Sequence, residues 1–205
     1  MDLSFLKDEY VIGLNKIFIG FKKFAFYPKY YVSVNKKVLE QSQKDIQQLN
    51  CIKFLSNRIG DKVKKSALTH IINTTDFIDD FSFDIEQGLQ EGYTVTYAAL
   101  QIGFYLGFKT IIIIGMDHRF SYVGNPNESN ILKGDDINHF SNQYFKNQNW
   151  DNPDLRNSEK YYAIANNIFR KHDRKIIDAT VNGACSIFKK MDYKEIFLRD
   201  KCVNS

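Results

Sequence analysis

The fold is decided by residues 92–119, which read GYTVTYAALQIGFYLGFKTIIIIGMDHR. The sequence predicts a helix over 95–106, with Thr94 at its start and Gly107 just past its end. The run at 110–114 is apolar, β-branched and bounded by glycine, which predicts a strand covered on both faces. Ligands of open α/β sheets bind beyond the carboxyl ends of strands. The polar triplet at 117–119 is therefore predicted to lie at a functional site.

Short apolar strands alternate with helices along the rest of the chain. The predicted strands are 10–14, 30–34, 52–55, 68–72 at an edge, and 175–178. We also predict one polar surface helix over 38–49 and an amphipathic helix over 158–172. This alternation is typical of an α/β, Rossmann-like fold with a mainly parallel sheet flanked by helices. We expect residues 1–205 to form a single nucleotide-binding, transferase-like domain.

Composition limits the class of partner. The formal net charge of +4 is mild and does not indicate a nucleic-acid partner. Three distant cysteines without a Cys-x-x-Cys motif favour neither a disulfide framework nor a zinc ribbon, so a reduced, cytoplasmic compartment is expected. No apolar run is long enough to cross a bilayer, and residues 1–9 do not resemble a secretory signal. The Phe/Lys stretch at 18–29 predicts core packing with lysines at the rim, with peripheral membrane contact as the alternative.

A long polar segment follows the isoleucine-rich strand. Residues 116–157 show no sustained period and are rich in Asn, Asp, Ser and Gly. Loops of this length inside compact domains are usually functional or disordered. The aromatic residues embedded in the segment favour order, so the sequence predicts an ordered, functional loop.

The loop carries a candidate catalytic group at Asp135, Asp136, Asn138 and His139. A histidine titrates near neutrality and can take a proton from an attacking hydroxyl while Asp or Asn orients it. A solvated polar loop is one alternative. A metal site that also recruits residues 117–118 is another, but no tight ligand spacing supports it and no metal ligand is assigned.

Two further pairs of residues are candidates for binding a nucleotide. Thr94 and Thr96 stand at a helix start, where hydroxyls and free backbone N–H groups can hold a phosphate. Ordinary N-capping is the alternative, and it needs only one threonine. Asn15 and Asn35 each end an early predicted strand, where a side-chain amide can pair with a base or sugar, although asparagine is also a routine strand terminator.

Several motifs together resemble a known family, that of proteins similar to hydroxymethylpterin diphosphokinase, which includes the motility accessory factors that glycosylate flagellin. The motifs that carry the resemblance are 92–100, 106–109, 114–118 and 138–140, with 153–155, 158–159 and 175–180 near the end. The resemblance covers most of the chain from Tyr10 onward. More distantly, the same layout is similar to the bacterial CMP-sialic-acid sialyltransferases.

The resemblance to the sialyltransferases implies a role for each candidate residue. It implies that Asn15 and Asn35 contact the nucleotide, and that the helix start at Thr94 and Thr96 binds the donor. It implies that His139 is the general base toward the acceptor hydroxyl. Asp135 or Asp136 is then expected to orient His139. Asp117 and Arg119 are expected at the nucleotide, with Arg119 as a cation for phosphate.

The expected function is a nucleotide-dependent glycosyltransferase of surface-glycan synthesis. Its donor would be a sugar of the CMP-nonulosonate kind, its acceptor a glycan or protein, and it would need no further cofactor. One alternative is a diphosphokinase that requires Mg²⁺ and ATP, with Asp117 and Asp135 or Asp136 as carboxylates. A non-catalytic nucleotide- or sugar-binding module is the other. The sequence leaves an oligomer open.

The resemblance also implies a segment that this sequence does not contain. The family begins with a strand and a Gly-Asn-Gly-Pro-Ser type loop that cradles the nucleotide. The present sequence starts just after the place of that loop. We expect either a natural start upstream of Met1 or a degenerate member whose sheet lacks a central strand.

Overall fold

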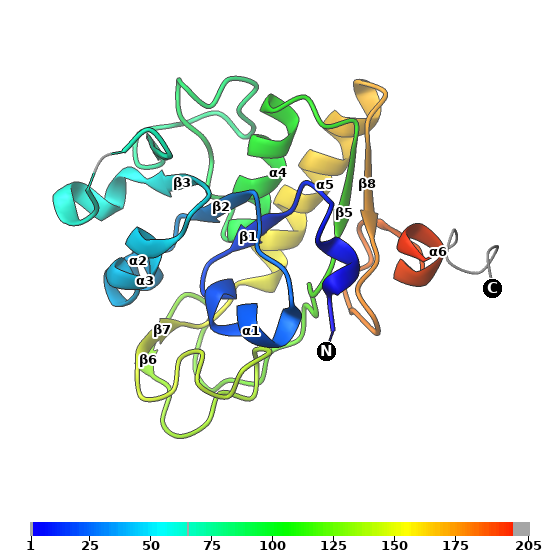
Figure 1. Ribbon diagram of the computed structural model, residues 1–205. Coiled ribbons are helices and arrows are strands. Elements are labelled where there is room, and N and C mark those ends of the chain that lie inside the picture. The colour runs from blue at the N-terminus through cyan, green and yellow to red at the C-terminus, as the bar shows by residue number, and fades with distance from the viewer. Residues whose placement is uncertain (1, 65, 199–205) are drawn as a thin grey trace.

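The alternating strands and helices form two parallel sheets in the computed structural model, which describes residues 2–64 and 66–198. The order of the first sheet is β1-β2-β3-β4 and that of the second is β5-β8-β9 (Figure 1). The first sheet consists of β1 (Ile12–Leu14), β2 (Tyr30–Ser33), β3 (Ile52–Ser56) and β4 (Thr69–Ile72). The second consists of β5 (Thr110–Ile113), β8 (Lys175–Asp178) and β9 (Lys189–Lys190). A small antiparallel pair, β6 (Ser129–Ile131) and β7 (Asn149–Asp151), stands apart from both.

The predicted α/β class and parallel strands are confirmed, whereas the expectation of one main sheet is wrong. Within the described residues, β1 and β5 are end strands of separate sheets and no strand ladder joins them. Both nevertheless lie against the helix α4 (Val95–Tyr105). A methyl group added at Gly103 would come within 2.5 Å of Ile111 Cδ1 and 3.8 Å of Ile12 Cδ1. The helix therefore covers the seam between the two sheets.

Helix α4 is buried along most of its length because it packs on both sheets. One flank, which includes Ala98 and Ile102, contacts the apolar side chains of the first sheet. The opposite flank, which includes Leu100 and Phe104, packs on the second sheet and on α5 (Leu155–Lys171). The two long helices thus hold the sheets in one layered arrangement, and Figure 1 shows them side by side behind the strands.

Two local predictions need correction. The strand at 110–114 ends at Ile113 and is only partly covered: Thr110 is exposed, and Ile111 and Ile112 are half-buried. An end strand has no neighbour on one side, which explains that exposure. The single surface helix expected over 38–49 is instead two helices, α2 (Lys36–Gln41) and α3 (Gln43–Gln48). They meet at Ser42, whose φ of −122° is not helical, and they bury several side chains: Val38, Leu39 and Ile46.

The remaining elements are short. They are the 3-10 helices η1 (Ser4–Leu6), η2 (Ile17–Gly20) and η3 (Asn57–Lys62) and the helices α1 (Phe21–Phe24) and α6 (Tyr193–Phe197). In the Phe/Lys stretch at 18–29, Phe24 and Phe26 are buried and the lysines are exposed, which confirms core packing. Cys51 and Cys185 are free and buried, and Cys202 lies outside the described residues. None of the helices in the described ranges has both the length and the hydropathy of a membrane span.

Candidate functional site

The long segment after β5 folds back across the carboxyl ends of the first sheet. Lys16, which follows β1, makes the principal attachment: its backbone N–H donates to Tyr144 Oη at 3.1 Å. Its Nζ donates to the Tyr144 carbonyl at 2.9 Å, to Gln148 Oε1 at 2.5 Å and to Gln41 Oε1 at 2.9 Å. Burial lowers the pKa of Lys16 to about 8, and the charges of Asp136 and Asp45 oppose that shift. The loop is therefore tied to the end of β1 by a buried cation.

Helix α2 makes a second attachment to the same loop. Lys37 Nζ forms an ion pair with Asp151 Oδ1 at 2.6 Å, and Gln41 Nε2 donates to the Asn149 carbonyl at 2.7 Å. An apolar cluster that includes Val38 of α2 and Trp150 of β7 fills the space between them. These contacts confirm that the loop is ordered, and in Figure 1 it lies at the bottom of the view, beneath the first sheet.

A hydrogen bond between Asp136 and His139 stands at the centre of the loop. Asp136 is buried and its Oδ2 lies 2.9 Å from His139 Nδ1. A carboxylate can only accept, so the Nδ1 nitrogen of His139 carries the hydrogen. The same carboxylate accepts from the backbone N–H groups of Asn138 and Phe145 at 2.9 and 3.1 Å. Asp136 is thereby fixed in place, and the neutral imidazole keeps a lone pair on Nε2, which has no hydrogen-bond partner within the described residues.

Aromatic side chains set the plane of the His139 ring. It stacks on Tyr144 with a centroid distance of 4.1 Å and an interplanar angle of 6°. The edges of Phe120, Phe145 and Trp150 surround it. Burial lowers the pKa of His139 more than the charge and hydrogen bond of Asp136 raise it. Burial therefore favours the neutral ring, which still has 20% of its side chain exposed, as a proton acceptor requires.

Asp135 lies in a different environment from its neighbour. Its carboxylate forms an ion pair with Lys146 at 2.6 Å and accepts from Asn142 Nδ2 at 3.2 Å. These partners lower its pKa, the hydrogen bond from Lys146 most of all. The structure thus brings Asp136, and not Asp135, into contact with His139.

The predicted helix start shows ordinary N-capping, which was the alternative to phosphate binding. It also brings side-chain hydroxyls together. Thr94 is the N-cap of α4, and its Oγ1 accepts from the Thr96 N–H at 3.3 Å. The hydroxyl of Tyr162, on α5, lies 3.1 Å from Thr94 Oγ1. Burial raises the pKa of Tyr162 to about 12, so this hydroxyl stays protonated. Two hydroxyls and the N-terminus of α4 consequently meet at one place.

The three residues after β5 differ in their surroundings. Asp117 is exposed, and its charge raises the pKa of His139. His118 is buried; its Nε2 lies 3.0 Å from Glu159 Oε1 and its ring centroid 5.9 Å from that of Tyr162. Arg119 is exposed and donates to the carbonyl of Asn182, in the turn after β8.

The two early asparagines occupy the carboxyl ends of neighbouring strands, as predicted. Asn15 follows β1 and its Oδ1 accepts from the Ser33 hydroxyl at 3.2 Å. Asn35 follows β2 and caps α2, because its Oδ1 accepts from the Val38 N–H at 3.1 Å. A nucleotide contact for either side chain stays a prediction.

The structure therefore gathers the candidates into two groups at one edge. The first is the Asp136–His139 pair, and the second is the cluster of hydroxyls around Thr94 and Tyr162. In the described part of the chain no hydrogen bond joins His139 to either threonine. The same residues include no set of three His, Cys, Asp or Glu side chains arranged to hold a metal ion.

Sequence reasoning missed the residues that support these groups. Lys16 and Tyr144 position the loop and the imidazole, and Tyr162 and Glu159 complete the second group. One signal was present for Tyr162. It lies three residues before Ala165 and seven before Phe169 on α5, which is the spacing of a buried helix face.

Comparison with known proteins adds no assignment: no family model, no curated protein and no solved structure matches this chain.

Proposed function

We propose that the protein is a nucleotide-dependent glycosyltransferase that uses a CMP-nonulosonate-type sugar donor in surface-glycan synthesis. The observation that carries the proposal is the buried Asp136 carboxylate bonded to His139 Nδ1, with Nε2 left as the proton acceptor. The sequence resemblance described above and a Rossmann-like reading of the parallel sheets support the same class. The site lies at the carboxyl edge, where ligands of such sheets bind.

In the proposed reaction, His139 acts on the acceptor. Its Nε2 takes the proton from an acceptor hydroxyl as the hydroxyl oxygen forms a bond to the anomeric carbon of the donor. The bond between that carbon and the nucleotide phosphate breaks, and its electron pair leaves with CMP. Asp136 holds the tautomer and stabilises the imidazolium that forms. Burial keeps the imidazole neutral before the reaction, because it lowers the pKa of His139.

The hydroxyls at the start of α4 would bind and stabilise the departing nucleotide. The backbone N–H groups at a helix start attract an anion, and the helix dipole favours negative charge there. The hydroxyls of Thr94 and Tyr162 lie at the same point, and Thr96 is in the first turn of α4. Donors that are fixed before the reaction stabilise charge that develops in the transition state. Asn15, Asn35 and Arg119 are proposed to bind the remainder of the nucleotide.

Two experiments test this proposal, first nucleotide binding and then turnover. A thermal-shift comparison of CMP, UDP, GDP and ATP conjugates should show the largest stabilisation with CMP compounds, because a ligand at 100 times its Kd stabilises the native state by about 2.7 kcal/mol. Release of CMP from a CMP-nonulosonate should then depend on an added glycan or protein acceptor. Both results should persist in EDTA.

Two outcomes would contradict the proposal. Stabilisation by ATP alone, together with turnover that EDTA abolishes, would assign the Mg²⁺-dependent diphosphokinase chemistry. Stabilisation by a nucleotide sugar without turnover toward any acceptor would assign the non-catalytic binding module.

A further inference from the structure

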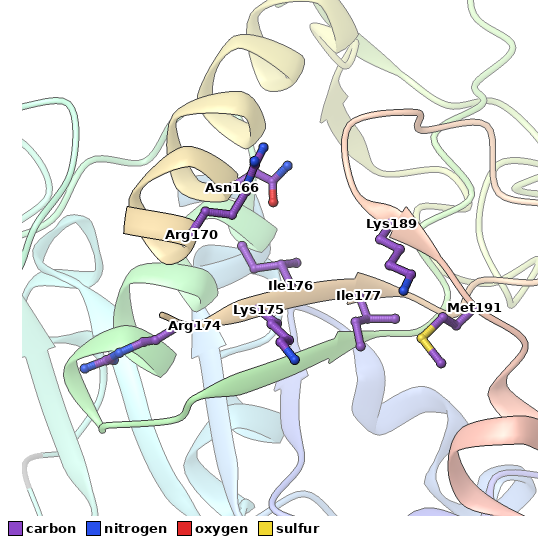
Figure 2. A pocket seen from close by; sticks show the side chains of 8 residues that line it. All are labelled: Asn166, Arg170, Arg174, Lys175, Ile176, Ile177, Lys189 and Met191. Atoms are coloured by element: carbon purple, nitrogen blue, oxygen red, sulfur yellow. The ribbon is translucent and has the colours of Figure 1, made fainter. Parts of the chain in front are cut away.

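A hollow lies between the last turns of α5 and the strands β8 and β9, away from the candidate site (Figure 2). Its volume of about 590 Å³ is within the range of small-molecule pockets. Residues from the amino end of β8 line it, whereas the candidate site lies at the carboxyl ends of the strands. The two sites share no residue, so the proposed transferase chemistry leaves this hollow without a role.

The lining of the hollow combines apolar and basic side chains. The apolar part consists of Ile176, Ile177 and Met191. The basic groups Arg170, Lys175 and Lys189 come from three elements, α5, β8 and β9. No acidic side chain lines the hollow, and none of these three charged groups has an ion-pair or hydrogen-bond partner within the described residues.

Two further basic residues, Arg174 of the lining and Lys190 outside it, are held by contacts within the protein. The Arg174 guanidinium lies 3.8 Å from the centroid of the Phe104 ring and donates to the Phe104 carbonyl, and Figure 2 shows it pointing away from the others. Lys190 forms an ion pair with the buried Asp178. Arg170 is favoured near the C-terminus of α5 by the helix dipole. The helix dipole does not account for the positions of the Lys175 and Lys189 charges.

We propose that the hollow binds an amphiphilic phosphate, that is, a phosphate monoester with an apolar chain. Such a group carries close to two negative charges at neutral pH, which the unpaired cations Lys175 and Lys189 can match. The two lysines act as point charges, whereas Arg170 lies on the α5 side of β8, opposite Lys175. The apolar chain would cover Ile177 and Met191, which are partly exposed beside the two lysines, whereas Ile176 is buried in the core against α5.

Octyl phosphate is the probe for this site, measured by calorimetry and by methyl NMR at low ionic strength. It should bind at least about tenfold more tightly than inorganic phosphate or octyl glucoside, because only octyl phosphate offers both charge and chain. Contacts from the chain should appear at the methyl groups of Ile177 and Met191. Inorganic phosphate that binds as tightly as octyl phosphate would overturn the proposal.

The double variant Lys175→Gln/Lys189→Gln tests the cations. It should bind octyl phosphate about five- to tenfold more weakly, as two partly exposed ion pairs allow. The matched control is Lys44→Gln/Lys171→Gln, which removes the same charge at exposed lysines outside the hollow and should change affinity less than about twofold. Equal binding by the two double variants would refute the site. Both variants should keep the wild-type melting temperature, because all four side chains are exposed.

The source of the ligand is tested separately with vesicles of phosphatidylcholine, with and without phosphatidate. Sedimentation with phosphatidate vesicles that the Lys175→Gln/Lys189→Gln variant loses would support the site and assign a lipid headgroup. Binding of octyl phosphate without any sedimentation would support the site and assign a free metabolite. Nucleotide binding should be unchanged in either case, so failure here is distinguishable from failure of the proposed transferase.

Discussion

Replacement of His139 by glutamine is expected to lower turnover of the nucleotide-sugar donor by about a hundredfold or more, the range that a general base contributes. Glutamine removes the basic Nε2 while its amide can still donate to Asp136, so the carboxylate keeps a partner. The change should appear in kcat with little effect on the affinity for CMP, because His139 is proposed to act on the acceptor. The measurement is steady-state CMP release at saturating donor.

The control for this variant is His70→Ala, which removes an exposed histidine on β4. It should keep wild-type turnover within about twofold, as surface substitutions usually do. A His139→Gln enzyme that keeps more than about a tenth of wild-type turnover would remove the general-base role, because such bases contribute more than that.

Replacement of Asp136 by asparagine is expected to have a comparable effect by a different route. An asparagine amide placed toward His139 Nδ1 would donate rather than accept, and the imidazole would then carry its hydrogen on Nε2. That tautomer cannot take a proton from the acceptor, so turnover should fall by about a hundredfold or more. Loss of the negative charge also removes an interaction that raises the pKa of His139.

The same variant should lose stability. Asp136 is buried and accepts from the backbone N–H groups of Asn138 and Phe145. An amide cannot accept from both and also satisfy His139, so one buried donor is left unpaired at a cost of about 1–3 kcal/mol. Urea unfolding measures this loss.

The neighbouring substitution Asp135→Asn is the matched control for Asp136→Asn. The Asp135 side chain is 54% exposed and pairs with Lys146 at the surface. We therefore expect near-wild-type turnover and a stability change within about 0.5 kcal/mol. Equal losses in both variants would show that the Asp136–His139 bond has no special role.

The strongest sequence signals were local, and the structure follows them. Helix α4 and strand β5 lie within one residue of their predicted bounds, because cap residues and the apolar run fix them without reference to the rest of the chain. The separation of the sheets between β1 and β5 could not be predicted in this way. Strand pairing depends on contacts between distant segments, and the sequence of neither strand indicates which strand it pairs with.

The candidate site, too, could be predicted from the sequence only in part. The spacing of three residues between Asp136 and His139 permits a contact in a turn, but Asp135 is equally close along the sequence. The choice between them is made by Phe145 and Asn138, whose backbone N–H groups bind Asp136, and by Lys146, which binds Asp135. The Tyr144 ring beneath the imidazole depends on the folding of an irregular loop, for which no periodicity exists.

The most direct test of a neutral, base-competent His139 within the nucleotide site is an NMR titration of its ring nitrogens with and without CMP. The account predicts a hydrogen on Nδ1, a pKa below the ordinary value of 6.5 and a shift of the ring resonances when CMP binds. Because the folded pKa is lowered, turnover should be full above it and decline as the pH falls through it. A ring that titrates at the ordinary value and does not respond to CMP would contradict the account.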